Sequence, residues 1–219
     1  MPTAMTTLLE GISLAGVPLA FLWTAFIIEL TPGPNMTYLA ILSISEGKKA
    51  GLAAVAGVAL GLLIVGLLAA FGLAAIVAQS RFLYEVMRWG GVVYLLWLAY
   101  DIWRQHDAKN ADQKNNSKSL ATYFQRGLIT NLLNPKAAVF YLAVMPPFID
   151  AGKPLLAQTL SLSVSYVIVA TCVHAAIVLL AAQARTALTN SAQVILINKT
   201  LSLSLVAVAL WLAWTTRQN

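Results

Sequence analysis

The chain has 219 residues, of which 59% are hydrophobic and 10% are charged, with a formal net charge of +6. Soluble domains carry about 25% charged residues, so this composition excludes an ordinary soluble domain and indicates an integral membrane protein. The basic residues lie between apolar stretches, which excludes a nucleic-acid-binding surface and is typical of the cytoplasmic loops of membrane proteins.

Six apolar stretches are long enough to cross a bilayer, which takes about 20 residues of helix. The sequence therefore predicts an all-α integral membrane protein with six transmembrane helices. The start of the sixth is open, because "AQVILIN" (192–198) fits either a helix or an interfacial segment. The predicted spans are 16–44, 51–79, 86–103, 127–149, 155–182 and 200–216.

The first predicted span is interrupted near its middle, within "IIELTPGPNMTYLA" (27–40). Pro32 and Pro34 have no amide proton, so carbonyl groups one turn earlier lose their helical partners. Inside a membrane such groups must line a polar cavity or be satisfied by neighbouring protein. The freed carbonyls can bind a cation, and the new helix N-terminus offers amides to a carboxylate. A simple packing kink is the alternative interpretation.

Glu29 is the acidic residue that we place deep within a predicted span. Burial disfavours its charged form, and a carboxyl group that changes charge near neutral pH suits a proton carrier. Alternatively, Glu29 is a structural carboxylate paired with Lys136 or with an amide of a broken helix. Ionisable residues inside membranes mark functional sites by default, so we predict that Glu29 binds substrate and couples protons.

Two features lie between the broken spans. "GVALG" (57–61) is a ridge of small residues that permits close helix packing, either within one monomer or across a homodimer. After the third span, "RQHDAKNADQKNNSKS" (104–119) is polar and predicts a flexible cytoplasmic linker. We therefore divide the single membrane domain, 1–219, into a first three-helix repeat (1–103), a linker (104–122) and a second three-helix repeat (123–219).

The fourth predicted span is interrupted at "NLLNPK" (131–136). Pro34 and Pro135 are separated by as many residues as Gly51 and Gly152, each of which follows a broken span. Because the second half begins after three spans, it enters the membrane inverted relative to the first. Proline-interrupted spans at corresponding positions are typical of inverted-repeat transporters whose site lies near the membrane midplane.

Polar side chains beside the two breaks are candidates for substrate binding. Lys136 pairs with Glu29, meets a substrate carboxylate or extends to the membrane interface. Asn35, Asn131 and Asn134 offer hydrogen-bond donors and acceptors to a substrate or to freed backbone groups.

His174, in the fifth span, is either a second candidate for proton coupling or a histidine that bonds a neighbouring helix. The sequence has no second His or Cys at ligand spacing to it, so it supports no metal site. The single cysteine, Cys172, excludes an intrachain disulfide and a dithiol redox pair. We expect no cofactor.

Both broken motifs resemble those of the LysE/RhtB family of amino-acid exporters. The resemblance implies two inverted three-helix units that export amino acids or their derivatives, driven by the proton gradient, in a bacterial inner membrane. The resemblance also implies a role in the site for the matching motif residues, which are Pro32, Gly33, Pro34, Asn35, Asn131, Asn134, Pro135 and Lys136. The matching segments are "TPGPNM" (31–36), "EGKKAGLAAVAGVALG" (46–61), "GGVVYLLWLAYDIW" (90–103) and "FQRGLITNLLNPKAAVFYLAVMPPFI" (124–149).

One segment departs from the family pattern. Many members carry an Asp or His in the second span, where this chain has the apolar "GLLIVGLL" (61–68). Glu29, immediately before the first motif, is unusual in the family. We interpret this as a transfer of the acidic function from span two to span one.

The distribution of basic residues predicts the orientation. Nine Lys and Arg residues fall in loops after spans one, three and five, against four on the other side, which places both termini in the periplasm. We expect a secondary transporter with a small amino-acid-like substrate, protons and the lipid bilayer as partners. A passive channel or a structural membrane subunit is the alternative. The sequence contains neither H-E-x-x-H nor G-x-S-x-G, so we expect no enzyme.

Overall fold

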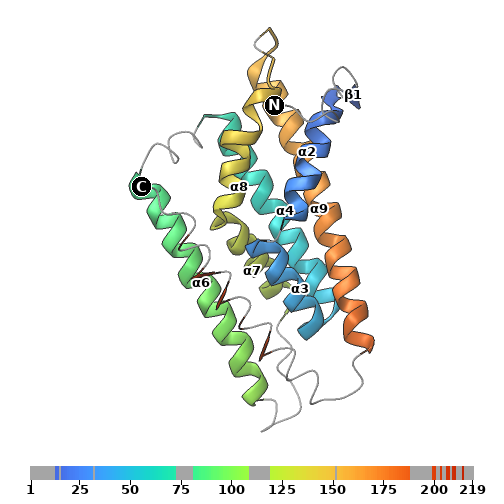
Figure 1. Ribbon diagram of the computed structural model, residues 1–219, viewed down its shortest axis with the longest axis vertical. Helices are drawn as coiled ribbons and strands as arrows, with labels where there is room; N and C mark the ends of the chain where they lie inside the picture. The colour runs from blue at the N-terminus through green and yellow to red at the C-terminus, as the bar shows by residue number, and fades with distance from the viewer. Residues whose placement is uncertain are drawn as a thin grey trace.

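The computed structural model describes residues 13–14, 16–31, 33–72, 81–108, 119–150 and 152–187, with individual residues between 199 and 214. The described chain is mostly helical, as the sequence predicts (Figure 1). Pro32, most of the predicted linker and much of the predicted sixth span lie outside the described residues.

The helices follow one another with alternating direction. In Figure 1, α2 and α3 descend, α4 ascends, α6 descends, α7 and α8 ascend, and α9 descends. Gly47, with φ of 89°, makes the turn between α3 and α4 in a single residue. The helices are α2 (Leu19–Leu30), α3 (Pro34–Glu46), α4 (Lys48–Ala70), α6 (Arg81–Ala108), α7 (Leu120–Leu132), α8 (Pro135–Val139), the π-helix η1 (Phe140–Val144), the 3-10 helix η2 (Pro146–Phe148) and α9 (Leu155–Ala187).

A short hairpin, which the sequence analysis did not predict, precedes α2 in the otherwise helical part of the chain that the structure describes. Strands β1 (Ser13–Leu14) and β2 (Val17–Pro18) pair antiparallel, with Leu14 opposite Val17. The turn includes Gly16 at a φ of 81°, a backbone conformation that favours glycine.

Two helices, α4 and the part of α9 from Leu155 to Ala184, are long and apolar enough to cross a membrane. A third crossing is formed if Leu120–Leu132 and Lys136–Phe148, bent by 53° at the second break, count as one span. Shorter apolar helices cover Leu19–Leu30 and Trp89–Tyr100. The described residues thus give two or three spans by length and composition, and the arrangement of six remains a prediction.

Several boundaries differ from those predicted. The second span ends at Ala70, because Phe71 and Gly72 form a turn, with Gly72 at a φ of 74°. Helices extend into both ends of the predicted linker, to Ala108 and from Leu120. The α7 extension begins at Ser119, whose hydroxyl accepts a hydrogen bond from the Thr122 amide. This capping interaction satisfies an otherwise unpaired amide of the first turn.

The centre of the fold is the contact between α4 and α7. A Cβ atom added to Gly57 would lie 2.0 Å from the Phe124 carbonyl oxygen, and one added to Gly127 would lie 2.1 Å from that of Ala54. The two backbones therefore touch, as small residues permit. The small-residue ridge of the sequence packs inside the monomer, so a homodimer would need another surface.

Candidate functional site

Both helix breaks lie at the predicted motifs. α2 ends at Leu30 and α3 begins at Pro34, which occupies the first helical position after Gly33. α7 ends at Leu132 and α8 begins at Pro135. Proline fits the first position of a helix, where its missing amide has no partner to lose. Each break therefore creates a new helix N-terminus inside the apolar part of the chain.

The second break is capped by its own asparagine. The Asn134 side-chain oxygen accepts a hydrogen bond from the Lys136 amide at 3.0 Å. Asn134 therefore satisfies a freed backbone group, which is one of the two roles predicted for it.

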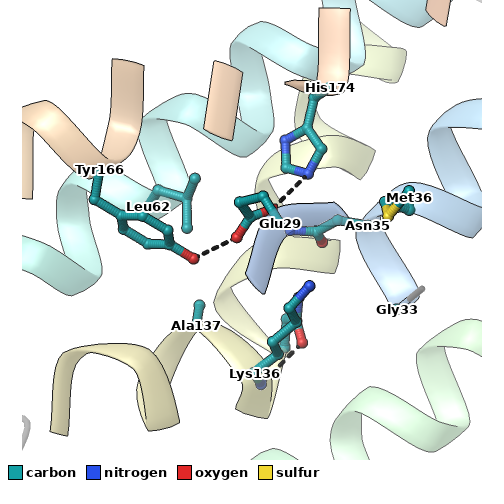
Figure 2. Close-up of a pocket in the computed structure, with 10 residues that line it drawn as sticks. Glu29, Gly33, Asn35, Met36, Leu62, Lys136, Ala137, Tyr166 and His174 are labelled. Carbon is teal, nitrogen blue, oxygen red and sulfur yellow. Dashed lines mark hydrogen bonds and ion pairs between the residues drawn. The ribbon is translucent and has the colours of Figure 1, made fainter. Parts of the chain in front are cut away.

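Residues from both breaks surround one small cavity, together with residues of α4 and α9 (Figure 2). Its volume is about 10 Å³, close to the minimum that holds a single water molecule. It is lined by Glu29, Gly33, Asn35, Met36, Leu62, Asn134, Lys136, Ala137, Tyr166 and His174.

Glu29 lies in the last turn of α2 and is only 4% exposed. The Tyr166 hydroxyl donates a hydrogen bond of 2.5 Å to its Oε1 atom. The Nε2 atom of His174 lies 3.2 Å from Oε2, at ion-pair distance but without hydrogen-bond geometry. Both partners come from α9, so Glu29 joins the first broken helix to α9 (Figure 2).

His174 is 1% exposed, and neither ring nitrogen has a hydrogen-bond partner among the described residues. Leaving the nitrogen atoms of a buried imidazole without hydrogen bonds destabilises the folded protein. The ring therefore has bonding capacity for a proton or a water molecule beside Glu29, and its role in proton coupling stays a prediction.

Lys136 connects the two breaks in a way that the sequence does not predict. Its ammonium group donates to the Thr31 carbonyl at 3.0 Å, a group just beyond the end of α2. The Lys136 side chain passes over Gly33, where an added Cβ would lie 3.5 Å from Lys136 Cδ. Lys136 and Glu29 line the same cavity, but each bonds other groups: Lys136 the Thr31 carbonyl, and Glu29 the Tyr166 hydroxyl.

Asn35 and Asn131 form a direct bridge between the first and second breaks. The Asn35 amide donates to the Asn131 side-chain oxygen at 2.8 Å, and both residues are buried. Their other polar atoms, Asn35 Oδ1 and Asn131 Nδ2, have no partner among the described residues. Of the two residues, Asn35 lines the small cavity. Because buried polar groups are normally hydrogen-bonded, both atoms are candidates for a bond to a polar ligand or water.

Tyr166 is the site residue that the sequence analysis missed. It precedes His174 by eight residues on one helix, and this spacing places both side chains on the same face. That periodicity was the available signal, but a tyrosine in an apolar span also fits simple packing.

A larger open cavity of about 360 Å³ lies at the opposite end of α9 from Ala187. It is lined in part by Pro18, Phe148, Asp150 and Gln158. The Gly152 amide and then the Lys153 ammonium lower the pKa of Asp150. Lys153 lines the same cavity and pairs with this carboxylate at 3.2 Å, so the two charges offset each other.

Apolar helices, two helix breaks and a buried ionisable cluster are typical of a multi-pass membrane transport protein. Its sequence matches the model of the LysE type translocator family over residues 26–216. The protein belongs to this family.

Several relatives are similar over most of the chain. The homoserine/homoserine lactone efflux proteins of Salmonella typhimurium and Salmonella typhi are each 34% identical over 150 residues, which is 68% of this chain and 73% of theirs. An uncharacterized membrane protein of Vibrio cholerae is 33% identical over 165 residues, 75% of this chain and 80% of its own. No solved structure matches the chain significantly.

Proposed function

We propose that the protein exports amino acids or amino-acid derivatives across the bacterial inner membrane in exchange for protons. The observation that carries this proposal is the buried Glu29 carboxylate, in a cavity that Lys136 also lines. One acidic and one basic group beside the same cavity match the ammonium and carboxylate groups of an amino acid. The efflux of homoserine and its lactone by the Salmonella relatives, as their names state, supports this class of substrate.

The substrate binds between the two helix breaks. Its carboxylate is held by Lys136 and by the amides at the start of α3, and its ammonium group by Glu29. The unpartnered atoms of the Asn35–Asn131 bridge accept and donate the remaining hydrogen bonds. The proposed substrate site comprises Glu29, Pro32, Gly33, Pro34, Asn35, Asn131, Asn134, Pro135 and Lys136.

Competition between a proton and the substrate for Glu29 couples the inward flow of protons to the export of substrate. A carboxylate that has taken up a proton can no longer pair with an ammonium group, so the proton and the substrate occupy Glu29 alternately. His174, with Nε2 3.2 Å from the carboxylate, exchanges the proton with it. Because Glu29 binds either a proton or the substrate but not both, the two move in opposite directions, which is antiport.

The proposed architecture is a single membrane domain of six helices, arranged as two inverted repeats (1–103 and 123–219) around the cytoplasmic linker (104–122). The opposite directions of the broken pairs α2–α3 and α7–α8 support it (Figure 1). Both termini lie in the periplasm, on the basis of the positive charges in the loops. The small volume of the cavity, about 10 Å³, favours this carrier over a passive channel.

Glu29→Gln tests the proposal in proteoliposomes loaded with labelled homoserine. Glutamine keeps the hydrogen-bonding shape but cannot take up a proton. We expect export driven by an imposed pH gradient to fall to the level of protein-free vesicles. Solute-for-solute exchange in the same vesicles, which moves no net proton, also falls, because the neutral amide cannot pair with the substrate ammonium group as the carboxylate does.

Glu46→Gln is the matched control, because Glu46 lies at the end of α3 and its carboxylate accepts a bond from Tyr123 outside the cavity. Gradient-driven export by Glu29→Gln at the wild-type rate, across roughly pH 5 to pH 8, would assign the proton to His174. Wild-type flux that ignores the gradient and does not saturate would show a channel.

A further inference from the structure

Tyr166 joins the Glu29 carboxylate to the second broken helix. It is 1% exposed, and its hydroxyl donates to Glu29 Oε1 at 2.5 Å. Its ring stacks face to face on Phe140, with centroids 3.6 Å apart and planes inclined by 9°. One side chain therefore contacts both the ionisable group of α2 and the first residue of η1.

The segment that carries Phe140 has unusual backbone geometry. η1 is a π-helix, closed by a hydrogen bond of 3.0 Å from the Met145 amide to the Phe140 carbonyl. Single π-helical turns are rare and are frequent at functional sites. η1 directly continues α8, so a shift of Phe140 along the stack also moves the turn that holds Lys136.

Phe140 is held from two sides. Besides the Tyr166 stack, its ring packs edge-on against Phe21 of α2 with centroids 5.9 Å apart. Glu29 joins α2 to α9, and the same two helices contact the second broken helix at Phe140.

We propose that Tyr166 is a positioning residue that transmits the charge of Glu29 to the second broken helix. An ionised carboxylate accepts the Tyr166 hydroxyl in a strong, charge-assisted hydrogen bond. When Glu29 takes up a proton or pairs with a substrate ammonium group, this bond weakens. The Tyr166 ring then releases Phe140, and α8 moves with Lys136. The inference rests on the proposed function, in which Glu29 changes charge during each cycle.

Other groups around Glu29 do not provide the same connection. His174 of α9 and Lys136 of α8 face the carboxylate, and α3 and α4 contribute the uncharged Asn35 and Leu62. Tyr141 of η1 packs edge-on against Tyr166, but its hydroxyl donates to the Leu62 carbonyl at 3.0 Å. Tyr141→Phe is therefore a matched control, with the same loss of a hydroxyl in the same aromatic cluster.

A distance measurement tests the proposal on the full-length protein in lipid nanodiscs. Spin labels are placed at the exposed positions Leu60 of α4 and Val139 of α8, after Cys172→Ser removes the exposed native thiol. We expect the label distance to shift between roughly pH 8 and pH 5. Tyr141→Phe retains this shift, and Tyr166→Phe loses it although its ring still stacks. Glu29→Gln, which is neutral at every pH, holds the low-pH distance.

A second variant keeps the test decisive if Tyr166→Phe folds poorly. Phe140→Leu preserves the hydroxyl–carboxylate bond and removes the stack, and we expect the same loss of the pH response. A pH-dependent shift of parental size in either variant would overturn the inference, as would a parent protein whose label distance ignores pH.

The distance is read without any transported solute, so the two proposals fail separately. A parent that shows the pH response but exports no amino acid would refute the proposed function alone. In the transport assay, Tyr166→Phe should lose gradient-driven export and retain solute exchange, whereas wild-type coupling in this variant contradicts the positioning role.

Discussion

In the proposed site, we expect Lys136 to determine which chemical form of a substrate is accepted. Its ammonium group bonds the Thr31 carbonyl, and an arriving carboxylate offers a stronger, charged acceptor. Lys136→Met keeps the length of the side chain and removes the charge. We expect export of an amino acid to fall about 10- to 100-fold, the effect of losing a hydrogen bond to a charged group.

The methyl ester of the same amino acid separates recognition from structure, because it has no carboxylate for Lys136 to bind. Its export, measured in the same proteoliposomes, should be similar in Lys136→Met and wild type. Lys153→Met, which removes an exposed cation from the loop before α9, serves as the control and leaves both substrates unaffected. An equal loss for acid and ester would mean that Lys136 only braces the Thr31 carbonyl.

The sequence predicted which side chains line the candidate site better than it predicted which residues they pair with. Glu29, Lys136 and His174 were identifiable because charged or titratable groups are costly in an apolar span. Their partners were not, since the His174 and Tyr166 contacts with Glu29 depend on how α9 packs against α2. A pair more than 130 positions apart in the sequence leaves no local periodicity to detect.

The crossing of α4 and α7 is the element contact that tolerates least change. A methyl group on Gly57 would overlap the Phe124 carbonyl oxygen and the Leu128 amide, and backbone atoms cannot turn aside as a side chain does. We expect Gly57→Ala to lower the free energy of unfolding by about 1–3 kcal/mol, the usual effect of overpacking. Thermal unfolding in detergent measures the change.

Gly90→Ala is the corresponding control in α6, because its added methyl group would meet only a Leu133 side-chain carbon at 3.5 Å. It should unfold at or slightly above the wild-type temperature, since alanine favours a helix more than glycine does. If Gly57→Ala were as stable as Gly90→Ala, the two backbones would have to be farther apart than the structure places them.

Helix breaks were the most predictable elements, and helix ends were the least. Pro34 and Pro135 impose their breaks through local chemistry, the missing amide, so the sequence alone locates them. The end of α4 at Ala70 could not be found in this way, because the apolar stretch continues beyond the turn at Gly72. Hydropathy measures a solvent preference and does not detect a change of chain direction.

On the scale of the whole molecule, the proposed inverted arrangement would assign each end of the bundle to one side of the membrane. Single cysteines at Lys49 and Ser119, in the Cys172→Ser protein, should react with a membrane-impermeant reagent only from the cytoplasm. A cysteine at Lys153 should react only from the periplasm. All three positions are exposed, so access to the reagent depends on the membrane side alone.

Labelling in intact cells and in inside-out vesicles makes the comparison complete, because each cysteine must react in one preparation and stay silent in the other. Reaction of Ser119→Cys and Lys153→Cys from the same side would contradict the proposal. The broken pair α7–α8 would then enter and leave on one side, and the second half would not be an inverted copy of the first.

The small size of the cavity also bears on whether protons can leak through the membrane. A channel of connected water molecules would let protons run down their gradient. A cavity of about 10 Å³ holds no more than one water molecule. A cavity of this size provides no chain of water molecules through the centre of the part of the chain that the structure describes. Under the proposed antiport mechanism, many copies of the protein could lie in the membrane without discharging the proton gradient, and protons would cross only in exchange for substrate.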